Sequence, residues 1–200
     1  MQSRLHFLLY PRESLIYGKS YEDWTVEWWK WLMQIPIVDN PSEDLKGKKA
    51  DMCQPGQQVM FLCQTIESSP FPTRIISIPD GTSIFMPVIN WLSVGGIDGN
   101  DYKELRQIAK QKIDVVKEMK FTINDIVITK EIWDFRVSSR PFEINFPFDN
   151  VLHIEPGIRK CISDGYWLFI KPTSLNSITS SGVCSTGETN IGVKYKINVA

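Results

Sequence analysis

Residues 74–94 read RIISIPDGTSIFMPVINWLSV and hold two apolar runs, 74–79 and 82–94, on either side of Asp80-Gly81. An Asp-Gly pair between two such runs is typical of the tight turn of a β-hairpin, so the stretch predicts two paired strands. Similar short runs, separated by turn residues, occur along most of the chain, at residues 58–65, 120–129, 133–138, 142–146, 151–154, 159–162, 166–171 and 192–199.

Apolar and polar side chains alternate strictly in the last of these runs, which is typical of a strand with one face in water. The apolar positions are Val193, Tyr195, Ile197 and Val199, and the polar positions are Lys194, Lys196 and Asn198. Asn124-Asp125 and Asp164-Gly165 are further candidates for tight turns. Eight to ten strands with two helices between them predict a mostly-β fold, a β-sandwich of jelly-roll type.

Residues 20–35 predict the first helix, because their apolar side chains recur at helical spacing. Ser20 can cap the N-terminus, with Asp23 at the third position in a variant of the capping box, and Pro36 ends the helix. A helix that is apolar over so much of its circumference is buried on several sides or covers a partner. Its main apolar face holds Tyr21, Trp24, Trp28, Trp31, Leu32 and Ile35.

A second helix is predicted over residues 101–119, where Asp101 is the cap and Glu104 completes a capping box. Its apolar stripe runs from Leu105 to Met119. We expect residues 1–16 to form an N-terminal extension and residues 17–200 to form a single soluble domain, which agrees with the length of the chain.

The sequence argues against nucleic-acid binding and against a membrane-spanning helix. The formal charge of 200 residues is −1, and the sequence shows no basic stripe of the kind that binds nucleic acid. No apolar run approaches the roughly 20 residues of a membrane-spanning helix. The apolar run at residues 5–10 is also shorter than the about 7–15 residues expected in a secretory signal peptide.

Cofactor motifs are absent from the sequence. Gly18-Lys19-Ser20 resembles the end of a phosphate-binding loop, but Glu13 occupies the position of the required earlier glycine. The four cysteines form no C-x-x-C pair, and only two histidines are present, which argues against structural zinc. We therefore expect no cofactor.

Candidate catalytic residues are few. A hydrolase or lyase would need a carboxylate of Glu22, Glu27 or Asp149 close to His153. Glu22 falls on an apolar arc of the first helix, where burial would raise its pKa. Glu22 and Glu27 are five positions apart, however, and do not share a helix face, which counts against a two-carboxylate mechanism. A structural role for His153 is the favoured interpretation.

One loop gathers oxygen ligands that would suit calcium, at Asp98, Asn100, Asp101 and Glu104. Lys103 occupies the position of the invariant glycine of a helix–loop–helix site. A glycine-rich connection that ends in a helix cap explains the same residues without a metal ion, and we favour that interpretation.

Trp29, Trp31 and Trp167 are the candidate ligand-binding residues, because an exposed indole can stack on a sugar ring or an apolar ligand. Tryptophan at helical spacing is ordinarily part of a core. The exposure of the helix tryptophans decides between the two interpretations: if all of them are buried in one protomer, the helix is a scaffold.

The cysteines bear on the compartment of the protein. Cys63 and Cys161 lie in strand-like runs, whereas Cys53 and Cys184 lie in polar stretches that would not bury a thiol. If one disulfide is present, we expect it to join Cys53 to Cys184, which would favour an oxidising compartment.

Four stretches of the chain resemble a family of uncharacterised, usually secreted bacterial and archaeal β-rich proteins with a Trp-rich N-terminal helix. The stretches are YGKSYEDW with WWKW at residues 17–31, IPDGTSIFMPVIN at 78–90, SDGYWL at 163–168 and GVKY at 192–195. The resemblance implies an extracytoplasmic β-domain and supplies no activity. Ser77 stands where similar sequences often have a cysteine, so a disulfide partner of Cys53 would differ here.

The leading functional hypothesis is a non-enzymatic extracytoplasmic domain that binds a ligand or protein partner or has a structural role. The alternatives are a hydrolase or lyase that acts on a glycan or small ester through an acid and His153, and a virion or surface-layer subunit. A homo-oligomer fits the last alternative best.

Overall fold

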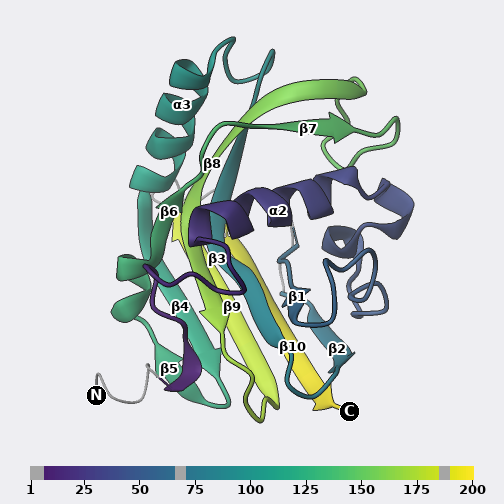
Figure 1. The fold of residues 1–200 in the computed structure, drawn as a ribbon, viewed down its shortest axis with the longest axis vertical. Helices are drawn as coiled ribbons and strands as arrows, with labels where there is room; N and C mark the ends of the chain where they lie inside the picture. Colours follow the sequence, from purple (N-terminus) through teal and green to yellow (C-terminus); the bar gives the residue numbers. More distant parts are fainter. Residues whose placement is uncertain (1–6, 66–70, 185–189) are drawn as a thin grey trace.

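Two mixed five-stranded β-sheets form the centre of the computed structural model (Figure 1), which describes residues 7–65, 71–184 and 190–200. The first sheet has the order β1-β3-β8-β6, with β7 also paired to β8, and the second has the order β2-β10-β9-β4-β5. The strands of the first sheet are β1 (Val59–Phe61), β3 (Ser83–Val94), β6 (Arg136–Ser138), β7 (Phe142–Phe146) and β8 (Gly157–Ile170). Those of the second are β2 (Thr73–Ile78), β4 (Val116–Ile123), β5 (Ile126–Ile128), β9 (Ser177–Cys184) and β10 (Asn190–Val199).

The mostly-β prediction is confirmed, since strands hold 41% of the chain and helices 22%. Two strand pairs are parallel, β1 with β3 and β2 with β10. Jelly rolls are built from antiparallel strands, so the jelly-roll type of the fold stays a prediction.

Three buried clusters divide the molecule into layers. The first cluster lies between the two sheets and includes Met86, Phe121, Leu168 and Tyr195. The second lies on the opposite face of the first sheet, under helix α2 (Tyr21–Gln34). Helix α3 (Tyr102–Asp114) forms a third, small cluster on Ile162 of β8. The first sheet is therefore covered on both faces, which explains why β3 and the second half of β8 are almost entirely buried.

The turn at Asp80-Gly81 joins the two sheets and does not close a hairpin, so the hairpin prediction is wrong. β2 pairs with β10 in the second sheet, whereas β3 pairs with β1 and β8 in the first. Gly81 does adopt a positive φ of 76°, so the local turn is formed as expected. The pairing differs because β2 and β3 bury their side chains in separate sheets.

The predicted turn at Asp164-Gly165 is also wrong, because β8 runs through both residues as one strand of 14 residues. A side chain at Gly165 would begin only 2.7 Å from Cα of Asn90 on β3. The glycine thus allows close contact between neighbouring strands, a role that sequence patterns do not separate from a turn.

Helix α2 agrees with the sequence, and Ser20 and Asp23 form the expected capping box. Helix α3 has the expected Asp101 cap but ends at Asp114 and not at residue 119. Val116 and Met119 belong to β4, where they are buried. These two residues are three positions apart, as on one face of a helix, and they are both buried in β4 because its pairing with β9 shifts register between Val116 and Glu118.

Shorter elements complete the chain. Three 3-10 helices occur among the described residues, η1 (Ile37–Asp39), η2 (Pro41–Glu43) and η3 (Glu131–Phe135). Residues 151–154, expected as a strand, form a turn, and β9 was not predicted because residues 177–184 are rich in serine. The N-terminal segment contacts β8, since the backbone N–H of Tyr10 donates to the carbonyl of Phe169 at 2.9 Å and Leu9 is buried.

Candidate functional site

The predicted catalytic carboxylates and His153 do not form one site. Glu22 is exposed on α2, so no apolar wall surrounds it, and Glu27 forms an ion pair with Lys19. Asp149 and His153 lie in the exposed loop between β7 and β8. Within the described residues, no hydrogen bond or ion pair joins His153 to any of these three acids.

The loop that carries His153 is organised by Asn150, not by a catalytic group. The Asn150 amide nitrogen donates to the carbonyls of Pro147 and Ile154, and its amide oxygen accepts from the backbone N–H of Ile154. His153 itself has a positive φ of 53°. Asn150 therefore has a structural role, since its side chain holds the turn of this loop together.

The candidate calcium ligands are occupied by the backbone of their own loop. Asp98 accepts from the N–H of Val94, Asp101 accepts from two N–H groups at the start of α3, and Glu104 accepts from the N–H of Asn100. The cap interpretation is confirmed for Asp101. In the described part of the chain, no three acidic, His or Cys side chains are grouped as metal ligands.

The tryptophans predicted to bind ligand are part of the core. Trp29 is 6% exposed, Trp31 is 7% exposed and Trp167 is fully buried. The indole N–H of Trp29 donates to Ser163 Oγ, and that of Trp31 donates to the carbonyl of Met52. Trp24 and Trp28 are also buried, so α2 is a scaffold and none of these rings is available for stacking.

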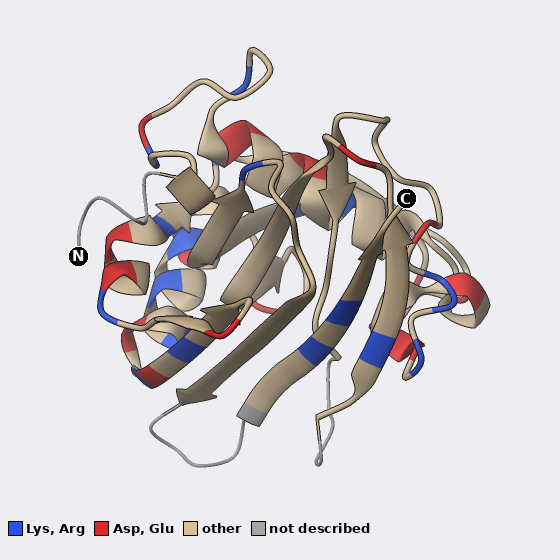
Figure 2. Ribbon diagram, turned by 90° about the horizontal axis from the view of Figure 1, so that it is seen from below, with Lys and Arg blue, Asp and Glu red and all other residues tan. Residues whose placement is uncertain are grey.

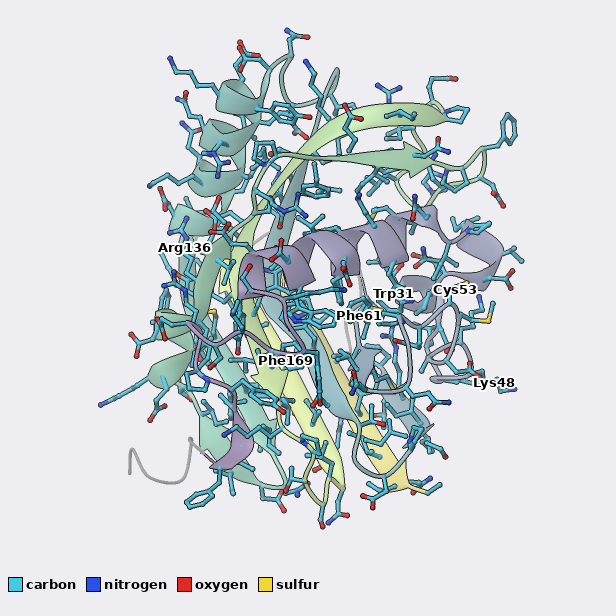
Figure 3. All side chains as sticks on the ribbon, in the orientation of Figure 1. Trp31, Lys48, Cys53, Phe61, Arg136 and Phe169 are labelled. Atoms are coloured by element: carbon cyan, nitrogen blue, oxygen red, sulfur yellow. The ribbon has the colours of Figure 1, made fainter. Side chains whose placement is uncertain are left out.

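Cys53 is a free, exposed thiol (Figure 3), and the structure therefore does not contain the predicted disulfide between Cys53 and Cys184. The side chain of Cys184 lies outside the described residues, and its backbone ends β9 in the second sheet, whereas Cys53 precedes β1 of the first. Cys63 and Cys161 are buried free thiols. Burial raises the pKa of Cys161 to about 12, so this thiol is a poor nucleophile at neutral pH.

Sequence reasoning missed a buried arginine, Arg74, which is 1% exposed on β2. Its guanidinium donates to the carbonyl of Asp44 at 2.6 Å, to the carbonyl of Cys63 at 2.6 Å and to the hydroxyl of Tyr195 at 2.8 Å. A longer contact of 3.3 Å reaches the carbonyl of Ser42. Arg74 alternates with exposed residues in the same way as the buried Ile76 and Ile78, and this pattern could have revealed it. The exposed Ile75 is also apolar, however, and hides the alternation in the sequence.

A cavity of about 10 Å³ lies beside this arginine, which is room for about one water molecule. Trp31 and Phe61 (Figure 3), whose ring centroids are 5.5 Å apart, form part of its wall. Asp44 and Gly47 also line it. Burial acts to raise the pKa of Asp44, but backbone N–H donors from Lys49, Lys46 and Gly47 outweigh it and hold the pKa below its usual value. The donors of Arg74 are used internally, so this cluster fastens residues 42–63 to the second sheet.

A second polar cluster lies on β6 and β8. Arg136 makes two hydrogen bonds to the buried carboxylate of Asp164, at 2.8 and 3.1 Å, and one to Asp114 at the end of α3. Two parallel N–H donors on one carboxylate form the bidentate geometry of a strong pair. The ion pair of Arg136 with Asp114 joins α3 to the first sheet, and Arg136 lies on the opposite side of the molecule from Cys53 (Figure 3).

The remaining surface of interest is the outer face of the second sheet, which we call the outer face. It consists of the exposed or half-exposed side chains that point away from the core cluster between the sheets. Its members are Thr73, Ile75 and Ser77 on β2, Lys194, Lys196 and Asn198 on β10, Ser177, Thr179, Ser181 and Val183 on β9, Glu118, Lys120 and Thr122 on β4, and Val127 on β5.

The outer face also carries an aromatic ring. A side chain at Gly192 would begin 2.7 Å from ring atoms of Phe71, so the Phe71 ring lies over the glycine, on the same side of β10 as Lys194. Phe71 remains 39% exposed. In the register of the strands, Gly192 is opposite Ser181, and Ser181 is opposite Lys120. The ring is therefore flanked by hydroxyl and ammonium groups.

Comparison of the chain with protein-family models, with curated proteins and with solved structures finds no match. The resemblance to secreted β-rich proteins therefore stays an expectation, and so does the extracytoplasmic location that it implies. Within the described residues, the longest helices are too short and too polar to cross a bilayer.

Proposed function

We propose that the protein is a non-enzymatic binding domain, and that it binds its ligand on the outer face. The observation that carries the proposal is the unequal covering of the two sheets. Both long helices pack on the first sheet, and no described helix covers the outer face of the second. A broad sheet face with hydroxyl, ammonium and aromatic side chains offers many weak contacts to an extended ligand, without a deep pocket.

The architecture that supports this proposal is a two-sheet sandwich in which α2 and the first sheet act as the scaffold. Because the first sheet is buried on both faces, substitutions on the outer face leave the aromatic core under α2 intact. The extracytoplasmic location remains part of the proposal only through the family resemblance, since the disulfide that would have supported it is absent from the structure.

The test is amide chemical-shift mapping of the labelled protein with three probes: dextran, polygalacturonate and vesicles that contain phosphatidylserine. We expect at least one probe to shift resonances of outer-face residues such as Thr73, Thr179 and Lys196, while resonances of α2 stay unchanged. Shifts confined to the His153 loop, or no shift with any probe, would contradict the proposal.

Two further measurements separate the alternatives. Release of reducing ends from a polysaccharide, lost on His153→Ala, would support the hydrolase hypothesis in place of ours. Light scattering of the purified protein would reveal a surface-layer subunit as discrete oligomers or filaments that bury the outer face.

A further inference from the structure

The outer face is more basic than the molecule as a whole. Lys120, Lys194 and Lys196 are exposed on it, against the single carboxylate of Glu118, whereas the formal charge of the chain is −1. In Figure 2, Lys and Arg colour part of β10, the strand that leads to the C-terminus, and acidic residues lie mainly on helices and loops. The charge of this face therefore attracts an anionic ligand.

The three ammonium groups are available for such a ligand. None of them takes part in an ion pair within the described residues, unlike Lys19 and Lys110. A carboxylate can therefore bind these lysines without breaking an existing ion pair, which keeps the free-energy cost of binding low.

The spacing of the lysines suits a polymer with repeated negative charges. Lys194 and Lys196 are alternate residues of one strand, so their Cα atoms are about 7 Å apart. Lys120 on β4 lies two strands from β10, which carries Lys194 and Lys196, and this corresponds to about 10 Å across the sheet. Long flexible side chains at these separations can meet successive charges of one chain.

The neutral side chains favour a polysaccharide as this polymer. Thr73, Thr179 and Thr122 form a row of hydroxyl groups across the sheet, with Lys194 in the same row. Hydroxyls can exchange hydrogen bonds with sugar hydroxyls, and the exposed Phe71 ring can stack on a sugar. A membrane surface fits less well, because most side chains of the face are polar and no described helix lies on it that could insert into a bilayer.

We propose that the outer face binds an acidic polysaccharide, with Lys120, Lys194 and Lys196 on its carboxylates and Phe71 against a sugar ring. The inference rests on the proposed function, in which this face is the binding surface, and it adds the chemical class of the ligand.

The experiment measures binding of polygalacturonate by calorimetry to the wild type and to two triple variants. K120Q/K194Q/K196Q removes the charge of the outer face, and K30Q/K103Q/K130Q removes the same charge from other parts of the surface. Surface ion pairs are individually weak, so we expect the first variant to bind about tenfold more weakly and the second to bind within about twofold of the wild type. Phe71→Ala weakens binding in low and high salt alike, whereas added salt weakens the lysine contribution.

The outcomes distinguish this inference from the proposed function. If dextran binds as tightly as polygalacturonate and its shifts map to the outer face, the acidic ligand class is wrong and the binding face stands. Equal losses in the two triple variants would also overturn the inference, as would binding to anionic vesicles without binding to the polymer. If no probe reaches the outer face, both proposals fail. Thermal unfolding of each variant checks that the substitution has left the fold intact.

Discussion

At the scale of single residues, Arg74 shows how a charge is accommodated inside the protein. A guanidinium remains protonated even when it is buried, so its five N–H donors need acceptors. Here the acceptors are mainly backbone carbonyls of residues 42–63, which are distant from Arg74 in the sequence but adjacent to it in space. Tyr195 extends the network by donating its hydroxyl hydrogen to the carbonyl of Cys63 at 2.6 Å.

Arg74→Met should lower the free energy of unfolding by about 3 kcal/mol or more, because it leaves several buried carbonyl oxygens without donors. Tyr195→Phe is the matched control, since it removes one hydroxyl from the same network and should cost about 1 kcal/mol. Urea unfolding followed by tryptophan fluorescence measures both values. Equal stability of Arg74→Met and the wild type would show that the network does not hold residues 42–63 in place.

At the scale of the elements, the sequence predicted where the helices begin but not which strands pair with each other. Ser20 and Asp101 mark the starts of both helices correctly, because a cap depends only on its own turn. The partners of β2 and β3 depend on which layer buries each strand, and no local residue specifies that. The same limit hides the continuity of β8, where Gly165 fits both a turn and a close strand contact.

Gly165→Ala tests the role of this glycine in β8. In an ordinary strand interior, alanine in place of glycine is stabilising. Here the new methyl carbon would lie 2.7 Å from Cα of Asn90 and from the carbonyl oxygen of Ile89, so the strands must move apart. We expect a loss of about 1–3 kcal/mol, measured by thermal unfolding.

Gly182→Ala on β9 is the comparison for Gly165→Ala. Its nearest neighbour is the side chain of Ile89, at 3.1 Å, which can shift more easily than a backbone. We therefore expect a smaller loss at this position. A smaller loss at Gly165 than at Gly182 would contradict the close-contact interpretation.

At the scale of the whole molecule, the layers decide which chemically suggestive residues are accessible. The tryptophans of α2 are buried because the helix covers the first sheet, and the lysines of β10 are exposed because no described helix covers the outer face of the second. The alternation in residues 193–199 predicted the wet side of β10 correctly, except at the end of the strand, where Val199 is 40% exposed. It could not show that this side belongs to a whole open face, because that depends on how five strands from distant parts of the chain assemble.

The fold lowers the pKa values of several carboxylates, and these groups determine how the stability of the protein responds to acid. Hydrogen bonds from Ser20 lower the pKa of Asp23, backbone N–H donors lower that of Asp101, and Lys110 and Arg136 lower that of Asp114. Backbone N–H donors lower the pKa of Asp44 as well. Each lowered pKa contributes stability that is present above the unfolded value, near 3.8, and is lost as the pH falls through the folded value.

The free energy of unfolding should therefore change little between pH 7 and about pH 5 and should decrease steeply below about pH 4, where these carboxylates become protonated. Asp44→Asn should be less stable than the wild type at pH 7, because the loop loses its anionic acceptor, and its stability should depend less on pH below pH 4. Asp51→Asn, which changes an exposed carboxylate in the same segment, is the control and should follow the wild-type curve. Urea unfolding at a series of pH values measures these slopes; a curve for Asp44→Asn parallel to that of the wild type would show that the ionisation of Asp44 does not contribute to holding residues 42–63 on the second sheet.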